Sequence, residues 1–424
     1  MAEQLDYIGY ILYAVQDCAG KGNCISDIKK ITVKGKIMKK TLMACALTGI
    51  VAGTACAQGN VTIYGIADTG IAKSTGSDVR IGSNVDSRIG FRGTEDLGDG
   101  LKAEFNLERC VNLSDGTRGA RHPNYQDQTM QMGEVIRTGD KSRVWQPPEW
   151  QSVANIGFRS ETFGAVHIGR VVNYAIENYR SLDPFYQNGV SAGLYTLVDS
   201  EVNAKTLRYD SPKWSGFSFG LAYTIGENTN PRSRNEGGAY LNRHHIDNDG
   251  WLIGGRYSNG ALDLLANYEK IVDSNDSYKW NLGAAYTFSD AGWGSLKVSA
   301  GYESVSIQAF NGLGTDAAVD IFNGLDHSIN QKNTIVGLQY RYGPHTVNAS
   351  YNHGKIEYGK DSKANKYALG YTYNLSKRTS LYANASYLDA DDAMASIAYN
   401  TYYPDLRTGH DTVVSYQVGI THKF

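Results

Sequence analysis

Hydrophobic and polar residues alternate along the last twelve residues of the chain. Val414, Tyr416, Val418 and Ile420 alternate with mostly polar neighbours, and the chain ends on Phe424. A period of two is typical of a β-strand with one apolar and one polar face. Many such strands in one secreted chain can close into a barrel whose apolar face contacts lipid. The C-terminal pattern therefore predicts a membrane-spanning strand.

Similar alternation recurs along the chain from residue 60 onward. It marks about sixteen segments of roughly ten residues, which is the length that a tilted strand needs to cross a bilayer. An even number of strands is expected for a bacterial single-chain barrel. The predicted strands are 60–72, 86–94, 100–112, 151–160, 163–172, 204–210, 216–226, 250–258, 261–270, 279–288, 293–305, 332–342, 344–355, 364–374, 379–389 and 412–424.

The connections between these segments alternate between short and long. Glu161-Thr162, Asn259-Gly260 and Gly343 are tight turns, whereas 113–150 and 173–203 are long loops. Short periplasmic turns and long extracellular loops, with both termini in the periplasm, are the usual asymmetry of an outer-membrane barrel. We therefore predict an all-β fold, a 16-stranded antiparallel transmembrane β-barrel in the outer membrane of a Gram-negative bacterium.

The period of two also assigns side chains to the two faces of a strand. In 279–288, Leu282 and Phe288 are predicted to face lipid, and Gly283 and Ala285 to face the lumen. In 364–374, the lipid face is rich in tyrosine: Tyr367, Tyr371 and Tyr373 flank Leu369. Tyrosines at strand ends, taken as a set, predict an aromatic girdle.

The N-terminal region predicts three segments. A basic start at Met38-Lys39-Lys40, an apolar run and Ala55-Cys56-Ala57 together indicate a secretory signal peptide over 38–57. The run is shorter than the roughly 20 apolar residues of a transmembrane helix. A lipid anchor on Cys56 is a weaker alternative. Residues 1–37 are interpreted as an upstream segment from a mis-chosen start codon, and 58–424 as the barrel domain.

Composition and charge agree with a polar barrel. The chain has 47 Gly and 30 Tyr, and its mean hydropathy is -0.39. Without residues 1–57, which hold seven of the 41 basic and four of the 43 acidic residues, 34 basic and 39 acidic residues remain, a formal charge of −5. Nucleic acid is not an indicated partner. Cys110 is the single cysteine in 58–424, so no internal disulfide is expected.

Metal, enzyme and adhesin functions are the alternatives. Cys18 and Cys24 make a weak zinc pattern, and His244-His245 with Asp247 and Asp249 is interpreted as a solvated loop. No serine, histidine and acid stand out as a catalytic group, although some outer-membrane barrels are enzymes. A surface adhesin would differ in having a plugged lumen. We predict no metal, no cofactor and no catalytic residue.

Six blocks of sequence resemble the general trimeric porins of beta-proteobacteria, the neisserial, bordetella and burkholderia type. The blocks run in family order, and the resemblance implies a homotrimeric barrel for passive diffusion of ions and small hydrophilic solutes. It also implies outer-membrane lipid, lipopolysaccharide and the barrel-assembly machinery as partners, with Phe424 as the assembly signal. The blocks are 61–68, 87–105, 163–170, 208–212, 374–382 and 416–424.

The resemblance also implies a constriction in the pore. In that family the third long loop, here Asn173 to Asn203, folds into the lumen and its acidic groups face basic side chains on the opposite wall. The result would be a transverse field across a narrow polar gate. The acidic candidates on the loop are Glu177, Asp183, Asp199 and Glu201.

Lumen parity then selects the basic wall. Arg88 and Arg92 alternate with Ile89 and Phe91, which take the lipid face. Many relatives carry arginine where this chain has Ser152-Val153 and Val202-Asn203, so the basic wall is thinner and the expected anion preference weak. The basic candidates are Arg88, Arg92, Lys102, Arg159 and Arg208.

Overall fold

The computed structural model describes ten ranges of the chain. The chain divides into two compact units, Met1–Cys56 and Ala57–Phe424, and every described residue belongs to the second. None of the helices in the described ranges is long and apolar enough to cross a membrane. The ranges are 60–117, 149–196, 201–226, 249–272, 274–290, 292–307, 309–310, 329–357, 361–391 and 412–424.

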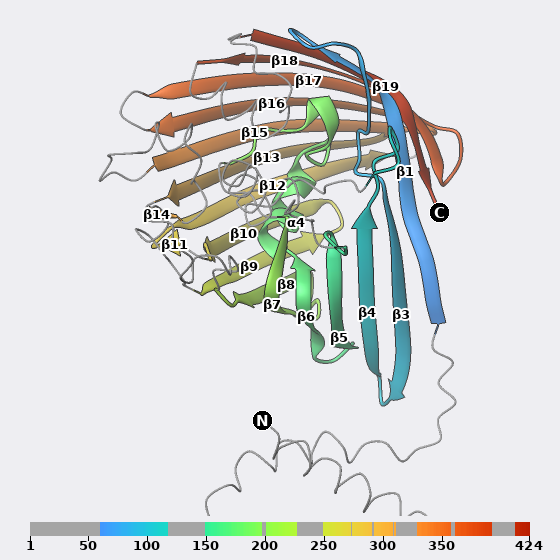
Figure 1. Ribbon diagram of the computed structural model, residues 1–424, viewed down its shortest axis with the longest axis vertical. Coiled ribbons are helices and arrows are strands. Elements are labelled where there is room, and N and C mark those ends of the chain that lie inside the picture. Colours follow the sequence, from blue (N-terminus) through green and yellow to red (C-terminus); the bar gives the residue numbers. More distant parts are fainter. Residues whose placement is uncertain are drawn as a thin grey trace, which may run out of the picture. The chain divides into compact units, whose positions relative to one another are not determined.

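Sixteen strands form one closed antiparallel barrel, in which consecutive strands pair with each other (Figure 1). The ring closes where β1 pairs with β19, from Ile66 opposite Lys423 to Ser74 opposite Ser415. Closure pairs the two edges that an open sheet would leave exposed. The predicted fold is confirmed, and each of the sixteen predicted segments overlaps one barrel strand. The barrel strands are β1 (Asn60–Ser74), β3 (Arg88–Gly98), β4 (Leu101–Cys110), β5 (Val153–Ser160), β6 (Gly164–Val172), β7 (Val202–Asp210), β8 (Phe217–Thr224), β9 (Gly250–Asn259), β10 (Leu262–Lys270), β12 (Tyr278–Asp290), β13 (Gly294–Ile307), β15 (Ile329–Tyr342), β16 (His345–Glu357), β17 (Ser362–Asn374), β18 (Thr379–Ala390) and β19 (Thr412–Lys423).

Three further strands lie in connections that the sequence predicted as loops. β2 (Arg80–Gly82) pairs with β1, and β11 (Ser274–Asn275) pairs with β14 (Ala309–Phe310). Two or three residues are too few for a period of two to be visible in the sequence, which is why these strands were not predicted.

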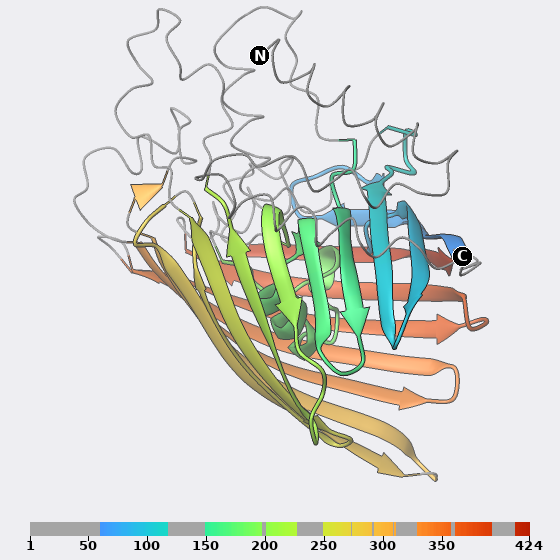
Figure 2. The same cartoon turned by 90° about the horizontal axis from the view of Figure 1, so that it is seen from below.

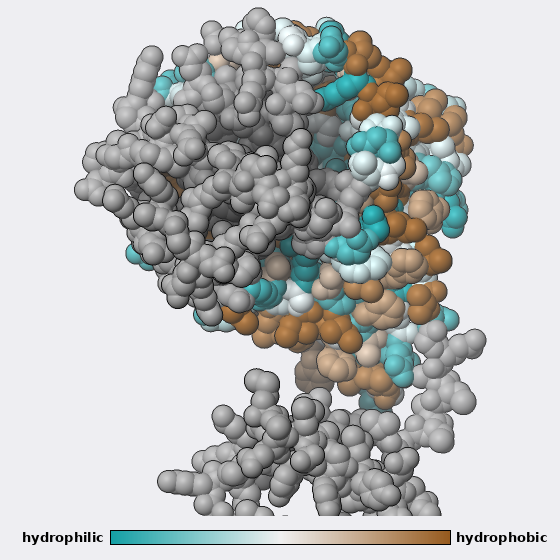
Figure 3. Space-filling view, viewed as in Figure 1, coloured by the Kyte–Doolittle hydropathy of each residue, from teal (hydrophilic) through white to brown (hydrophobic). Residues whose placement is uncertain are grey.

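The observed exposure confirms the predicted faces of the strands. On β12, Leu282 and Phe288 are exposed on the outside, whereas Ala285 is buried in the barrel. On β17, Leu369 is 60% exposed while its neighbour Ala368 is 7% exposed. The outer face therefore presents apolar side chains, and Figure 3 shows hydrophobic residues gathered along the side of the barrel formed by β1, β3 and β4. Water-exposed apolar area of this extent is stable only against lipid or another protein.

Aromatic residues form two belts on the outer face of the longer strands. Midway along β16 and β17, Tyr351 and Tyr367 lie with ring centroids 5.0 Å apart, and next to the long connection between β10 and β12 Tyr268 stacks on Tyr278 at 5.9 Å. Near the short turns, Trp293 stacks on Tyr340 at 6.3 Å. Amphipathic rings prefer the two interfaces of a bilayer, so the belts mark its boundaries. The predicted girdle is present on this part of the barrel.

The strands differ in length around the barrel. β5 to β8 have eight or nine residues, whereas β12, β13 and β15 to β18 have 12 to 14. Figures 1 and 2 show the short strands beside the long ones. The outer face of β1 to β6, here named the aliphatic face, exposes mainly branched aliphatic side chains. Its exposed members include Val61, Ile63, Ile71, Ile156, Phe158, Val166 and Ile168.

Candidate functional site: the loop in the barrel lumen

The connection between β6 and β7, residues 173–201 and here named loop 3, turns into the barrel (Figures 1 and 2). It begins with the short helix α4 (Tyr174–Tyr179), where the Asn173 side-chain oxygen accepts hydrogen bonds from the amides of Ala175 and Ile176. An asparagine in this position satisfies amides that lack a helical partner. Two 3-10 turns follow, η3 (Arg180–Leu182) and η4 (Gly189–Ser191). The described part of loop 3 thus has a defined fold inside the lumen.

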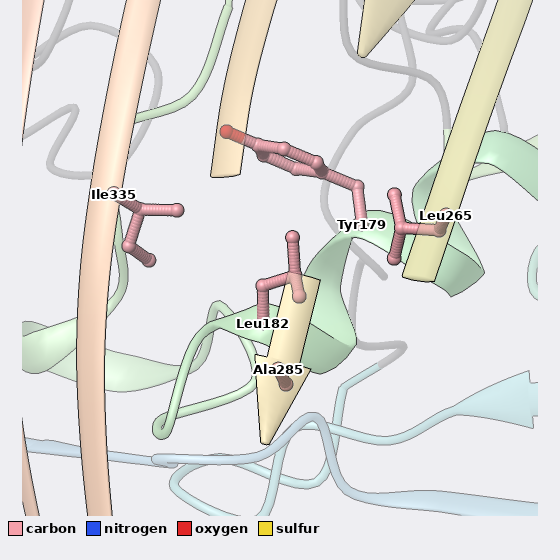
Figure 4. Packing of buried hydrophobic residues seen from close by; sticks show 5 residues of the cluster. All are labelled: Tyr179, Leu182, Leu265, Ala285 and Ile335. Atoms are coloured by element: carbon pink, nitrogen blue, oxygen red, sulfur yellow. The ribbon is translucent and has the colours of Figure 1, made fainter. Parts of the chain in front are cut away.

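Apolar side chains of loop 3 pack against the barrel wall. Tyr179 and Leu182 form a buried cluster with Leu265 on β10, Ala285 on β12 and Ile335 on β15 (Figure 4). Leu182 is 1% exposed, although it lies in a polar lumen. Burial of a leucine of this size contributes about 1.5–3 kcal/mol. The cluster therefore holds loop 3 against one side of the lumen.

Glycines line the wall where loop 3 rests. A Cβ atom on Gly254 would lie 2.7 Å from the Tyr174 ring, and one on Gly337 would lie 2.6 Å from Pro184. Real Cβ atoms essentially never come so close to a neighbouring atom, so any side chain here would displace loop 3. We name this set the glycine seat. It comprises Gly220, Gly254, Gly283, Gly301, Gly337 and Gly370, on β8, β9, β12, β13, β15 and β17.

Asp183 organises the bend of loop 3. Its carboxylate accepts hydrogen bonds from the amides of Phe185 and Gln187, both at 2.9 Å, and of Gly193 at 2.8 Å. Tyr186 and Gln187 have positive φ angles of 56° and 53°, which cost free energy in residues other than glycine. Burial raises the pKa of the Asp183 carboxyl, although the three amide donors oppose this. Asp183 is thus a structural acceptor, 2% exposed to the pore.

The other acidic candidates of loop 3 have different surroundings. Glu177 forms an ion pair of 2.8 Å with Arg208 on β7, and its side chain is 53% exposed. Glu201 is buried and pairs with Arg180 of the same loop. Asp199 lies outside the described residues. Of the predicted acidic and basic candidates, the structure therefore brings together Glu177 and Arg208.

The basic candidates on β3 face the lumen as predicted. Arg88 lies 3.4 Å from Glu108, whose carboxylate also accepts a hydrogen bond from Tyr64. Arg92 is exposed, and its guanidinium lies over the Tyr64 ring, 4.9 Å from the ring centroid. Among the ion pairs of the described residues, none includes Arg92. Arg92 therefore keeps its positive charge available to the pore.

Lys102 and Arg159 lie close to the short turns. Arg159 on β5 donates two hydrogen bonds to Glu104 through Nε and one through Nη2, at 2.9–3.1 Å. His167 on β6 contacts the same carboxylate at 2.5 Å. Lys102 on β4 is exposed, and no ion pair of the described residues involves it. Of the basic wall, Arg92 and Lys102 are the two open charges.

Several functional residues were not predicted. Lys297 on β13 donates a 2.7 Å hydrogen bond to the carbonyl oxygen of Ser181, and so ties loop 3 to the wall. Arg256 on β9 pairs with Asp263 beneath loop 3. Both lie on lumen-facing positions, so the rule that selected Arg92 would also have found Lys297 and Arg256. Their partners could not be found, because they depend on how loop 3 folds.

Loop 3 contains a hydrolase-like motif that was not predicted. Residues Gly189 to Gly193 read Gly-Val-Ser-Ala-Gly, the spacing of a nucleophile elbow. That elbow requires a strand, a sharp turn and a helix, whereas this segment is a 3-10 turn. Ser191 is fully buried and donates a hydrogen bond to the carbonyl oxygen of Ala385. Within the described residues, no metal-binding cluster occurs either, and His244, His245 and Asp247 lie outside them.

A closed sixteen-stranded barrel, apolar outside and narrowed inside by a folded loop, defines a β-barrel membrane channel. The family model of the Gram-negative porins matches residues 41–393, and the chain belongs to that family. The resemblance noted in the sequence is thereby confirmed. The protein is an outer-membrane porin, a channel for passive diffusion and not an enzyme.

Individual relatives agree with this assignment. An outer membrane porin protein of Bordetella pertussis is 30% identical over 82% of this chain and 94% of its own length. Outer membrane porin protein 32 of Delftia acidovorans is 29% identical over 91% of this chain and 100% of its own. The solved anion-selective porin from Comamonas acidovorans has a TM-score of 0.60 and 23% identity, covering 86% of this chain and 100% of its own, which supports the fold.

Proposed function

We propose that loop 3 forms the constriction of this channel and sets which solutes pass. Loop 3 is seated against β8 to β17, and the wall of β3 and β4 carries the open charges of Arg92 and Lys102. Solutes would pass between the two. This arrangement, a packed loop beside a wall with unpaired positive charge, is the observation that carries the proposal. It favours small hydrophilic solutes and gives a weak preference for anions.

Ion pairs between the arginines of the wall and nearby carboxylates explain why the preference for anions should be weak. Arg88, Arg159 and Arg208 each have a carboxylate partner within 3.4 Å, so their fields are largely cancelled. Only the remaining open charges act on a passing ion over about a Debye length, roughly 10 Å at 0.1 M salt. Anion preference should therefore fall as the salt concentration rises.

Single-channel recording in a planar bilayer with a salt gradient tests the proposal. We expect ohmic openings, and a reversal potential that moves towards cations in an Arg92→Glu, Lys102→Glu double variant. Lys213→Glu makes the same kind of charge change on the exposed turn between β7 and β8 and is the matched control. A folded barrel that does not conduct, or a reversal potential that shifts equally in the control, would contradict the proposal.

We further propose a homotrimer that associates through the aliphatic face. β5 and β6 are among the shortest strands of the barrel, and the exposed members named above for this face include no tyrosine or tryptophan. An apolar surface of this kind fits a second copy better than a lipid interface. Ile156→Lys should give monomers on native electrophoresis, whereas Leu369→Lys on the belted face should leave the trimer intact.

Lipopolysaccharide and the assembly machinery are the remaining proposed partners. Lys332 and Lys355 lie on outward-facing positions on the long-loop side of Tyr351, and both pair with Glu357, at 2.8 and 3.0 Å. We propose that lipid headgroup phosphates compete with Glu357 for these two lysines. Co-purified lipid A should decrease in a Lys332→Ala, Lys355→Ala variant.

Phe424 exchanges two backbone hydrogen bonds with Gly65, and its side chain remains 45% exposed. We propose that the assembly machinery binds this side chain before the barrel closes. Removal of Phe424 should lower the amount of folded barrel in the outer membrane.

A further inference from the structure

Asp68 is a buried carboxylate at the seam where the barrel closes. It lies on β1, is 1% exposed, and none of the ion pairs of the described residues includes it. Its oxygens accept hydrogen bonds from the Tyr382 hydroxyl at 3.1 Å and from the Thr421 hydroxyl. These partners belong to β18 and β19. The side chain of Asp68 on β1 thus bonds to two further strands and links three consecutive strands around the seam.

Asp68 also holds the connection between β2 and β3, through its carboxylate and through its backbone. The amide of Asn84 donates a 2.6 Å hydrogen bond to Asp68 Oδ1. Ser87 donates from its hydroxyl to the Asp68 carbonyl oxygen and accepts from the Asp68 amide, both at 2.8 Å. A buried carboxylate without a cation is costly unless donors surround it, and here backbone and hydroxyl donors do so. The segment 84–87 is therefore fixed against the seam.

Asn84 in turn lies beside η4 of loop 3, residues Gly189–Ser191, here named the tip. A Cβ atom on Gly189 would meet the side chains of Asn84 and Gln417, so the tip contacts both. Asn384 donates a 3.0 Å hydrogen bond to Asn84 Oδ1, which fixes the orientation of that amide. The tip is also anchored directly, because Ser386 donates to the Val190 carbonyl oxygen at 2.7 Å. The tip thus rests on a surface of which Asn84 is one part.

We infer that Asp68 is a positioning residue of the pore constriction, which fixes the tip of loop 3 through Asn84 while lying outside the path of the solute. The inference rests on the proposed role of loop 3 as the constriction. The register partner of Arg92 on β1 is Thr62, six residues from Asp68, so Asp68 would influence conduction through the loop. Its removal should let the tip move, without changing the charge that a passing ion meets at Arg92 and Lys102.

Open-channel current noise measures this movement. Losing the bond to the Asn84 amide should raise the population of the displaced tip about fivefold. The variance of the open-channel current is proportional to that population while the displaced state is rare, so we expect it to rise about fivefold in Asp68→Ala. The protein is purified from the outer membrane of an expressing bacterium. Asp68→Asn and Thr421→Val serve as milder variants, which test the inference even if Asp68→Ala does not fold. Each should show a smaller rise in noise at unchanged ion selectivity.

The matched control is Ser415→Ala. Ser415 is buried at the same seam and bonds to Ser74 at 2.8 Å, but no hydrogen bond of the described residues joins it to Asn84 or loop 3. It should lower stability without raising the noise. Equal noise in Ser415→Ala and Asp68→Ala would overturn the inference, because seam weakening alone would then explain the effect.

A cross-link provides the second readout. Ser191→Cys and Ser386→Cys, oxidised to a disulfide during folding in a Cys110→Ser background, should hold the tip and return the noise of Asp68→Ala to the level of the cross-linked parent. All three positions are buried, so the bond has to form during folding and not with a reagent added afterwards. Persistent noise after complete cross-linking would contradict the inference. The reversal potential of the Arg92→Glu, Lys102→Glu variant separates this failure from failure of the proposed function, because its shift does not depend on Asp68.

Discussion

The two walls of the lumen differ in what their side chains contact. The docking wall, formed by β8 to β17, has glycines and small polar residues facing loop 3, and its charged residues Arg256 and Lys297 bond to a carboxylate or to the loop. The open wall, formed by β3 to β5, presents Arg92 and Lys102 to water. The same fold thus uses one wall to hold the loop and the other to meet the solute. A charged residue that faces the lumen can therefore be assigned to loop binding or to contact with solute only when the wall that carries it is known.

The largest effect is expected from the docking wall. Gly283→Ala places a Cβ against Leu182 and 2.9 Å from the Ala300 carbonyl oxygen. Overpacking of this kind costs about 1–3 kcal/mol. We expect a lower midpoint of urea unfolding in detergent. The single-channel conductance should fall, because loop 3 is pushed off the docking wall towards the open wall and narrows the passage.

Gly255→Ala is the matched control for that change. Gly255 lies on the outer face of β9, and its nearest neighbour to a new Cβ is Phe217 at 3.7 Å, an ordinary contact. It should leave the unfolding midpoint and the conductance unchanged. Adding Leu182→Ala to Gly283→Ala should return the conductance towards the wild-type value if the clash with Leu182 dominates over that with the Ala300 carbonyl oxygen. If Gly283→Ala and Gly255→Ala had the same unfolding midpoint and the same conductance, the glycine seat would not differ from the outer face in its tolerance of a side chain.

An intermediate effect is expected at Arg208, where loop 3 meets the wall. Its guanidinium donates to Asp210, to Glu177 and to the Val172 carbonyl oxygen at 2.7–3.0 Å. Arg208→Ala leaves Asp210 without this partner, at a cost of about 1–3 kcal/mol, reduced by the exposure of Glu177. Arg208→Lys should recover less than half of the loss, because a single ammonium cannot reproduce the fork. The free energy of unfolding in urea measures this. If Arg208→Lys recovered all of the loss, the positive charge alone would explain the contact, without the hydrogen-bond geometry of the guanidinium.

The smallest effect on stability is expected on the open wall. The Arg159 side chain is 53% exposed, and its ion pair with Glu104 lies in contact with water. A double-mutant cycle with Arg159→Gln and Glu104→Gln should give a coupling below about 1 kcal/mol. The reversal potential should nevertheless move in opposite directions in the two single variants. A coupling as large as the loss at Arg208 would mean that the open wall is structural as well.

The sequence predicted the barrel well because each strand carries its own period-two pattern. The lumen positions of Arg88 and Arg92 follow from Ile89 and Phe91 alone, with no knowledge of other strands. The partners of those side chains do not follow in this way. The pairing of Arg159 with Glu104 depends on the register between β4 and β5, which places Gly157 opposite Glu104. Register is a property of two strands together.

Loop 3 was the least predictable part of the site. Asp183 was predicted as an acidic group of the gate, but its carboxylate is taken up by three backbone amides of the loop. The alternation of hydrophobic and polar residues does not indicate that the backbone amides of a loop will surround one of its charged side chains. The glycine seat was also not predicted, because Gly283 and Gly337 are close in space to loop 3 only after the barrel has closed. The pore roles of the predicted charges remain predictions.

The glycine seat has a consequence for how such a channel can evolve. A position that tolerates no Cβ cannot accept a new charge, so mutations on the docking wall are removed before they can alter permeation. Substitutions at Arg92 or Lys102 meet no such barrier. We expect natural variants of this chain to acquire new solute preferences through the open wall while the path of loop 3 stays fixed, which confines adaptation to three of the sixteen strands.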